Sequence, residues 1–177
     1  ALGIDNFSGT VGGNISGTSD LAPLDQQADM LLELLPEAQN VGILYCSAEA
    51  NSVYQADVVK AALEEKGVTV TVYTFADSND VATVTQTACA ENDALYIPTD
   101  NTAASCAEAI NNVAEPAGVP IVAGEEGICK GCGIATLSID YYELGKTTGA
   151  MAAKILTGEA NVSEMPIEYY QNPVKKY

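Results

Sequence analysis

From about residue 22 onward, short apolar runs with strand character alternate with stretches whose apolar residues recur at helical spacing. One such helical stretch starts near Pro23 and places Leu24, Ala28, Leu31 and Leu35 on one face. The runs with strand character are Val41–Cys46, Val68–Phe75, Leu95–Ile97, Val119–Ala123, Ile134–Ile139 and Pro166–Tyr170. Strands that alternate with helices predict an α/β fold, here a Rossmann-like three-layer α/β/α lobe with a mainly parallel sheet.

Two segments lie outside this alternation. Residues 1–20 are rich in Gly, Ser, Thr and Asn and predict a loop or a chain crossing rather than the start of a domain. A helix from Tyr141 to about Thr157, followed by the last strand, comes after a sheet that is already complete. We therefore expect both ends of the chain to belong to something other than the main sheet.

Polar side chains follow most of the predicted strands, and they are densest after Leu95–Ile97, at Pro98-Thr99-Asp100-Asn101-Thr102. In an open α/β sheet, ligands bind at the carboxyl ends of the strands, where helix N-termini also gather. The same residue types cap helices, as Asn51 or Ser52 would do for the helix after the first strand. Around Asp100, capping and ligand contact are both open.

The charge balance excludes several partners. Against 24 acidic residues there are 7 basic ones, and the formal net charge is −17. Nucleic acid and anionic membrane surfaces need clusters of Lys and Arg, so neither is expected as a partner. No apolar run approaches the ~20 residues of a membrane span. We attribute the acidity to solubility.

The chain shows no catalytic or metal-binding motif. It contains no His, no G-x-G-x-x-G and no P-loop, so His-based triads and phosphate loops are excluded. Cys46, Cys89 and Cys106 lie in apolar patterns and are predicted to be buried. Cys129-Lys130-Gly131-Cys132 lies in a glycine-rich stretch predicted as a loop, and zinc would need two further ligands. A disulfide that pins the loop or an incidental thiol pair is favoured over catalytic redox chemistry, and no cofactor, metal or catalytic residue is predicted.

Four segments in this order resemble the ABC-transporter substrate-binding proteins of the tryptophan/aromatic amino-acid type, a branch of the periplasmic-binding-protein class I fold. They are Gly12–Asp20, Glu49–Ser52, Pro98–Thr102 and Asp140–Gly145. The resemblance implies two Rossmann-like lobes joined by three crossing strands, with the ligand held between the lobes. Residues 1–20 would then end an N-terminal lobe, 21–139 would form the second lobe, and 140–177 would return to the first.

The resemblance also implies a site and a function. The implied ligand-binding residues are Thr18, Ser19, Asp20, Asn51, Ser52, Asp100, Asn101, Glu125 and Asp140. Asp100 would accept the ammonium of an amino acid, and Ser52 would receive its carboxylate. The implied function is the solute-binding component of an ABC importer, with a small polar ligand such as an aromatic amino acid and an ABC permease as partners. It would act outside the cytoplasm, in the periplasm or as a lipoprotein.

Several expectations remain open at this point. Most of the N-terminal lobe and any signal or lipoprotein segment are missing from the pattern, so a dimer of the fragment is an alternative for covering the helix from Tyr141. A ligand-binding sensor domain is the alternative function, and an α/β enzyme is favoured less. The residues do not determine the ligand or the redox state of Cys129 and Cys132.

Overall fold

The computed structural model describes residues 8–170 and 172–176, and the chain divides into two compact units. Unit 1 comprises Ala1–Ala22 and Ile139–Val174, and unit 2 comprises Pro23–Ser138 and Lys175–Tyr177. The chain thus passes between the units after Ala22, after Ser138 and after Val174. The assignment of residues 1–20, 21–139 and 140–177 to two lobes of a longer protein stays a prediction.

Unit 2 is built on a six-stranded sheet. Its strand order is β3 (Thr69–Phe75), β2 (Asn40–Cys46), β4 (Ala94–Ile97), β5 (Ile121–Ala123), β6 (Ala135–Ser138) and β8 (Val174–Lys176). The β3–β2, β2–β4, β4–β5 and β5–β6 pairs are parallel, and Val41 is paired with both Val70 and Ala94. The predicted α/β fold with a mainly parallel sheet is confirmed.

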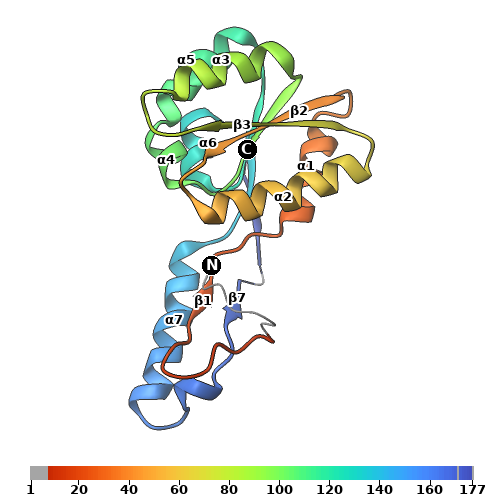
Figure 1. Cartoon of the computed structure of the whole chain (residues 1–177). Helices are drawn as coiled ribbons and strands as arrows, with labels where there is room; N and C mark the ends of the chain where they lie inside the picture. The colour runs from red at the N-terminus through yellow and green to blue at the C-terminus, as the bar shows by residue number, and fades with distance from the viewer. Residues whose placement is uncertain (1–7, 171, 177) are drawn as a thin grey trace. The chain divides into compact units, whose positions relative to one another are not determined.

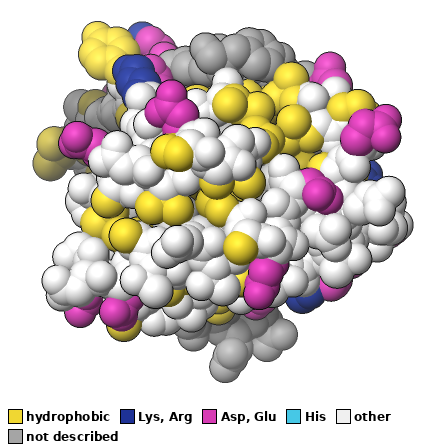
Figure 2. All heavy atoms as spheres, turned by 90° about the horizontal axis from the view of Figure 1, so that it is seen from above, with side chains coloured by type: hydrophobic (Ala, Val, Ile, Leu, Met, Phe, Trp, Pro, Cys, Tyr) yellow, Lys and Arg dark blue, Asp and Glu magenta, His cyan; other side chains and the backbone are white. Residues whose placement is uncertain are grey.

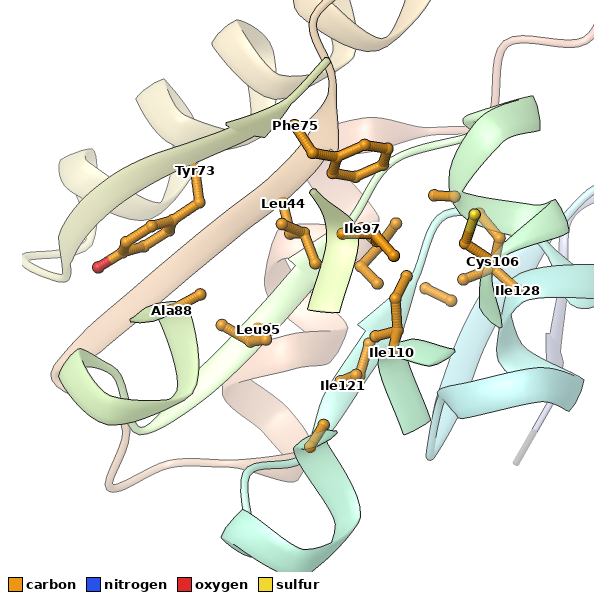
Figure 3. Close-up of a cluster of buried hydrophobic side chains, with 14 of the residues drawn as sticks. Leu44, Tyr73, Phe75, Ala88, Leu95, Ile97, Cys106, Ile110, Ile121 and Ile128 are labelled. Atoms are coloured by element: carbon orange, nitrogen blue, oxygen red, sulfur yellow. The ribbon is translucent and has the colours of Figure 1, made fainter. Parts of the chain in front are cut away.

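Helices cover both faces of this sheet (Figure 1). One face carries α1 (Leu24–Leu34) and α2 (Ala50–Glu65). The other carries α3 (Val81–Glu91), α4 (Asn101–Ser105), α5 (Ala107–Ala117) and α6 (Glu126–Cys132). Central strands are buried on both faces, as a parallel sheet between two helical layers requires. Figure 3 shows the core under α3–α6, where Leu95, Ile97 and Ile110 are fully buried.

The glycine-rich segment before β6 is a helix, so the predicted loop is wrong. The Glu125 side chain caps α6 by accepting hydrogen bonds from the N–H groups of Gly127 and Ile128. Ile128 is fully buried and anchors the helix to the core. The cap and this one apolar anchor outweigh the low helix propensity of Gly127 and of the glycine inside the C-x-x-C.

Two predicted helix starts also differ from the structure. Helix α2 begins at Ala50 with Glu49 as its N-cap residue, so Asn51 and Ser52 lie inside the first turn rather than capping it. The alternation of strands and helices predicts one helix between Leu95–Ile97 and Val119–Ala123, but the structure has two, α4 and α5, which meet at Cys106. The predicted burial of three cysteines is confirmed for Cys46, Cys89 and Cys106.

Unit 1 is smaller and has little core. Its helix α7 (Tyr141–Leu156) accompanies two parallel two-residue strands, β1 (Thr18–Ser19) and β7 (Glu168–Tyr169), and a 3₁₀ turn at Val162–Glu164. One buried cluster of this unit contains Ala22, Ile139 and Leu144, with Tyr170 packed against them, and Met151 and Met165 are also buried. The predicted last strand is thus shorter than 166–170, and the part of the loop prediction that covers residues 1–7 lies outside the described residues.

None of the helices in the described ranges has the length and hydropathy needed to cross a lipid bilayer. Figure 2 shows one face of the molecule, on which acidic side chains are spread among hydrophobic and uncharged ones and Lys side chains are few.

Candidate functional site

The carboxylate of Asp100 lies at the junction of β2, α2 and α4. One oxygen accepts hydrogen bonds from the N–H of Cys46 (2.9 Å) and the hydroxyl of Ser52 (2.7 Å), and the other accepts from the N–H of Ala103 (2.7 Å). Asp100 is 1% exposed and Ser52 is fully buried. Asp100 therefore acts as the N-cap of α4 and as a buried cross-link between the ends of two strands.

A second carboxylate, that of Glu49, also accepts hydrogen bonds from the start of α4. One oxygen accepts from the N–H (2.9 Å) and side-chain amide (3.1 Å) of Asn101, and the other accepts from the N–H and hydroxyl of Thr102, both at 2.8 Å. Partial burial raises the pKa of Glu49, but these four hydrogen bonds outweigh it, so the pKa lies below its ordinary value. Together, Glu49 and Asp100 satisfy the first three N–H groups of α4.

Polar side chains of α2 hold the backbone of Thr99, directly before Asp100. The Thr99 carbonyl accepts hydrogen bonds from the amide of Asn51 (2.9 Å), the hydroxyl of Ser52 (3.3 Å) and the amide of Gln55 (3.3 Å). The Gln55 carbonyl oxygen accepts in return from the Thr99 N–H at 3.1 Å. Gln55 lies four residues after Asn51 on the same helical face, a spacing that could have indicated its role.

Gln27 on α1 links the ends of three strands. Its amide donates to the carbonyls of Gly124 (3.0 Å) and Leu137 (2.8 Å), and its carbonyl accepts from the hydroxyl of Tyr96 at 2.5 Å. Gln27 and Tyr96 are completely buried, and burial raises the pKa of the Tyr96 phenol. The sequence around Gln27 does not indicate this role, because the three partners of its side chain lie 69, 97 and 110 residues away.

The start of α2 differs from the start of α4. Its third and fourth N–H groups, those of Ser52 and Val53, donate to the carbonyl of Glu49. Within residues 8–170, the first two N–H groups, those of Ala50 and Asn51, make no hydrogen bond, and no side chain caps this helix. The side chains of Asn51 and Asn101 are exposed beside this helix end. Two unpaired donors and two exposed amides can bind a small polar or anionic group.

The structure thus brings Asn51, Ser52, Asp100 and Asn101 together, as predicted for one strand edge. Glu125 follows the neighbouring strand β5. The ends of β4 and β5 lie very close, since a Cβ added to Gly124 would be 2.7 Å from the N of Thr99. In unit 2 the side chains with formal charge at this junction are carboxylates. Three Lys residues of the unit instead pair with acidic side chains: Lys60 with Glu64, Lys66 with Asp29 and Lys130 with Glu126.

The other predicted residues lie in unit 1. The hydroxyl of Thr18 is 2.7 Å from that of Thr148, and the hydroxyl of Ser19 accepts from the N–H of Leu21 at 3.3 Å. Asp20 is exposed, and Asp140 caps α7 by accepting from the N–H groups of Tyr142 and Glu143. All of these contacts lie within unit 1. All nine ligand contacts stay predictions.

The carboxylate oxygens at this edge of the sheet are engaged in hydrogen bonds. Its buried carboxylates are saturated by backbone and hydroxyl donors, so neither oxygen of Asp100 is placed to abstract a proton. Among the described residues, no group of three or more Cys, Asp or Glu side chains is arranged to hold a metal ion.

Comparison with known proteins identifies a family. The family model described as ABC transporter substrate binding protein matches residues 4–174. A "Tyrosine-binding protein" of Clostridioides difficile (strain R20291) is 32% identical over 156 residues, which are 88% of this chain and 45% of that protein.

Solved structures show the same similarity. The ABC domain from Streptococcus pneumoniae in complex with L-Trp has a TM-score of 0.87 at 30% identity, over 94% of this chain and 56% of that one. A ligand-free, open substrate-binding protein with adhesive properties from Clostridium difficile has a TM-score of 0.76 at 32% identity, over 98% and 58%. The chain spans about half the length of these relatives.

Proposed function

Because the chain belongs to the ABC transporter substrate-binding protein family, we propose that it is part of the solute-binding component of an ABC importer. Its ligand is an aromatic amino acid, bound between two lobes of the longer protein. The relatives named for tyrosine and for L-Trp support this ligand class. The protein is not an enzyme, and it works outside the cytoplasm, in the periplasm or lipid-anchored on the outer face of the membrane, where it delivers ligand to an ABC permease.

One observation carries the proposal for this chain's own residues: the unpaired N–H groups of Ala50 and Asn51 lie beside carboxylates that lock the neighbouring helix. An α-amino acid has a carboxylate and an ammonium close together. The carboxylate binds the two open N–H groups of α2, where the helix dipole favours an anion. The ammonium lies on the side of the half-buried Glu49, whose negative charge attracts it without a direct hydrogen bond, because both oxygens already accept two.

The nine predicted residues divide into two roles in this proposal. Asn51 and Asn101, which are exposed, contact the ligand, and Glu125 at the end of β5 extends the same edge. Asp100 and Ser52 are buried, so they act by holding the start of α4 in place; their burial favours this over the direct contacts predicted for the ammonium and carboxylate. Thr18, Ser19, Asp20 and Asp140 contribute from the segments that belong to the first lobe.

Isothermal titration calorimetry on the full-length protein tests the function. We expect L-tyrosine, L-tryptophan or L-phenylalanine to bind, and mass spectrometry to recover the bound amino acid unchanged. The variant Asn51→Ala should lower affinity about tenfold, the effect of one lost hydrogen bond at the ligand. Asn112→Ala is the matched control, because Asn112 is an exposed Asn on α5 whose loss should leave affinity unchanged.

Two outcomes contradict the proposal. If the folded full-length protein binds none of the three aromatic amino acids, the ligand class is wrong. If it binds them and neither Asn51→Ala nor Asn101→Ala changes affinity, the ligand does not lie at this strand edge.

A further inference from the structure

Helix α6 carries two thiols that the proposed ligand site does not use. Cys129 and Cys132 are both free and both half-buried. Both pack against the same hydrophobic core cluster, beside Ile128, and both line one cavity of about 670 Å³ between the ends of α5 and α6. The two side chains therefore lie on the same face of the helix.

Residues three apart in an α-helix have Cα atoms separated by about 5 Å, from a rise of 1.5 Å per residue and 3.6 residues per turn. A disulfide accepts Cα separations of roughly 4.4–6.8 Å and Cβ separations of about 3.5–4.5 Å. The Cβ atoms of helix neighbours three apart are about 5–6 Å from each other, so the last turn of α6 has to distort as the bond forms. We propose that Cys129 and Cys132 are a modification site: they form an intrahelical disulfide across the last turn of α6 when the protein meets a disulfide oxidant.

The local structure can accommodate this bond. Cys132 is the last residue of α6, and the Gly133 that follows it closes the turn by donating its N–H to the Cys129 carbonyl at 2.9 Å. The thiol of Cys132 gives up one weak hydrogen bond, to the carbonyl of Ile128 at 3.4 Å. Gly131, between the two thiols, packs on Ala107, where an added Cβ would be 2.4 Å from the Ala107 Cβ. This contact holds the middle of the turn while the two cysteines adjust around it.

The other three cysteines do not compete for this bond. Cys46, Cys89 and Cys106 belong to the core cluster on which the pair packs, but they are only 2%, 9% and 8% exposed, so a disulfide oxidant reaches them less readily than the half-buried pair. Neither they nor the pair on α6 are joined by a disulfide in the structure.

The reaction is a thiol–disulfide exchange with an oxidised low-molecular-weight disulfide such as oxidised glutathione. The Cys129 thiolate attacks one sulfur of the oxidant and expels the first glutathione thiolate. The Cys132 thiolate then attacks the Cys129 sulfur and expels the second. The two cysteines lose two protons and two electrons, and the oxidant is reduced to two thiols.

The surroundings of the two thiols make formation of the disulfide slow, unlike that of a catalytic cysteine pair. Burial and the neighbouring Glu125 and Glu126 raise the pKa of the Cys129 thiol. Burial, chiefly, raises the pKa of Cys132 to about 12. Because the thiolate is the reacting form, exchange near neutral pH is slow, as expected of a structural bridge.

Differential alkylation tests the proposal on the purified chain. The chain is equilibrated with glutathione buffers of increasing oxidation, denatured in acid and alkylated with N-ethylmaleimide. It is then digested and analysed by mass spectrometry. We expect the peptide containing both Cys129 and Cys132 to lose two hydrogen masses and take up no N-ethylmaleimide, while Cys46, Cys89 and Cys106 are alkylated.

Two variants complete the test. Cys132→Ser should abolish the bridge and leave Cys129 alkylated or glutathionylated, and Cys106→Ser should leave it intact. Full alkylation of both cysteines in the most oxidising buffer, a stable glutathione adduct on the unsubstituted chain, or a bridge to another cysteine would overturn the proposal. No ligand enters the measurement, so its failure is distinct from failure of the proposed function.

Discussion

Two helix starts on the same sheet edge, those of α4 and α2, are built in opposite ways. The first three N–H groups of α4 are occupied by the carboxylates of Asp100 and Glu49. The first two N–H groups of α2 are unpaired in the described structure. The start of α4 is thus internally satisfied, whereas the start of α2 keeps two backbone donors for the ligand contact proposed above. The start of α4 also shows that polar residues clustered in a sequence can bind one another and the backbone, as Asp100 and Ser52 do.

Removing the Asp100 carboxylate should have the largest effect. Asp100→Ala leaves the N–H of Cys46, the hydroxyl of Ser52 and the N–H of Ala103 without their acceptor, so we expect the free energy of unfolding to fall by about 3–5 kcal/mol. Urea unfolding followed by circular dichroism measures it. Asp77→Ala is the control, because Asp77 is exposed and accepts from its neighbour Asn79; it should cost less than about 1 kcal/mol. Equal losses for the two variants would contradict the supporting role.

Crowding the same corner should have the next largest effect. In Gly124→Ala the new Cβ would be 2.7 Å from the N of Thr99 and 2.8 Å from the carbonyl carbon of Pro98, and backbone cannot yield as a side chain does. We expect a loss of about 1–3 kcal/mol in the same urea assay. Gly145→Ala in α7, where an added Cβ meets nothing within 4 Å, should be neutral or stabilise the chain. If Gly124→Ala did not lower the free energy of unfolding, the backbone at Pro98 and Thr99 would be able to move away from the new Cβ, contrary to this prediction.

Glu49→Gln should have a smaller effect that depends on pH. The variant weakens the bonds to Asn101 and Thr102 at a partly solvated site, so we expect a loss of about 1 kcal/mol at pH 7. The pKa of Glu49 is lowered in the folded chain, so the stabilisation by its charge is present above the ordinary value of 4.5 and is lost as the pH falls through the lowered pKa. The difference between Glu49→Gln and the unsubstituted chain in urea unfolding should therefore shrink below pH 4.5. A pH-independent difference would contradict the charge effect.

Asn51→Ala should have the smallest effect on stability. The Asn51 side chain is exposed, and the Thr99 carbonyl keeps two other donors, those of Ser52 and Gln55. We expect a change below about 1 kcal/mol in urea unfolding, while the calorimetric affinity of the full-length protein falls. A large loss of stability would place Asn51 with Asp100 and Ser52 rather than among the ligand contacts.

The fold could be predicted from the sequence because alternating apolar runs carry it locally. Val41–Cys46 and Leu95–Ile97 have the continuous apolar character of strands buried on both faces, and both are central strands of the sheet. Helix α6 is not predicted, because the low helix propensity of its glycines dominates the segment and Ile128 is its one fully buried apolar residue. Its capping residue, Glu125, was noted only as a candidate ligand contact.

The sequence could predict where the candidate site residues lie but not which of their side chains are buried. The sequence located Asp100 and Asn101 at a strand end, yet whether each side chain is buried depends on Ser52 and Cys46, which come from other elements. The four hydrogen bonds of Glu49 also join segments about 50 residues apart. Such pairings arise only when the sheet has formed, and the local sequence does not contain them.

The chain passes between the two units three times, and this determines which unit can fold first during synthesis. Apart from its last residues, unit 2 is one unbroken stretch from Pro23 to Ser138, whereas unit 1 joins residues from both sides of that stretch. During synthesis the central strands β2–β6 leave the ribosome before α7 and β7 exist, so the sheet can begin to form first. The pairing of Thr18 with Glu168 must wait until residue 168 has been made, and it closes a loop of about 150 residues.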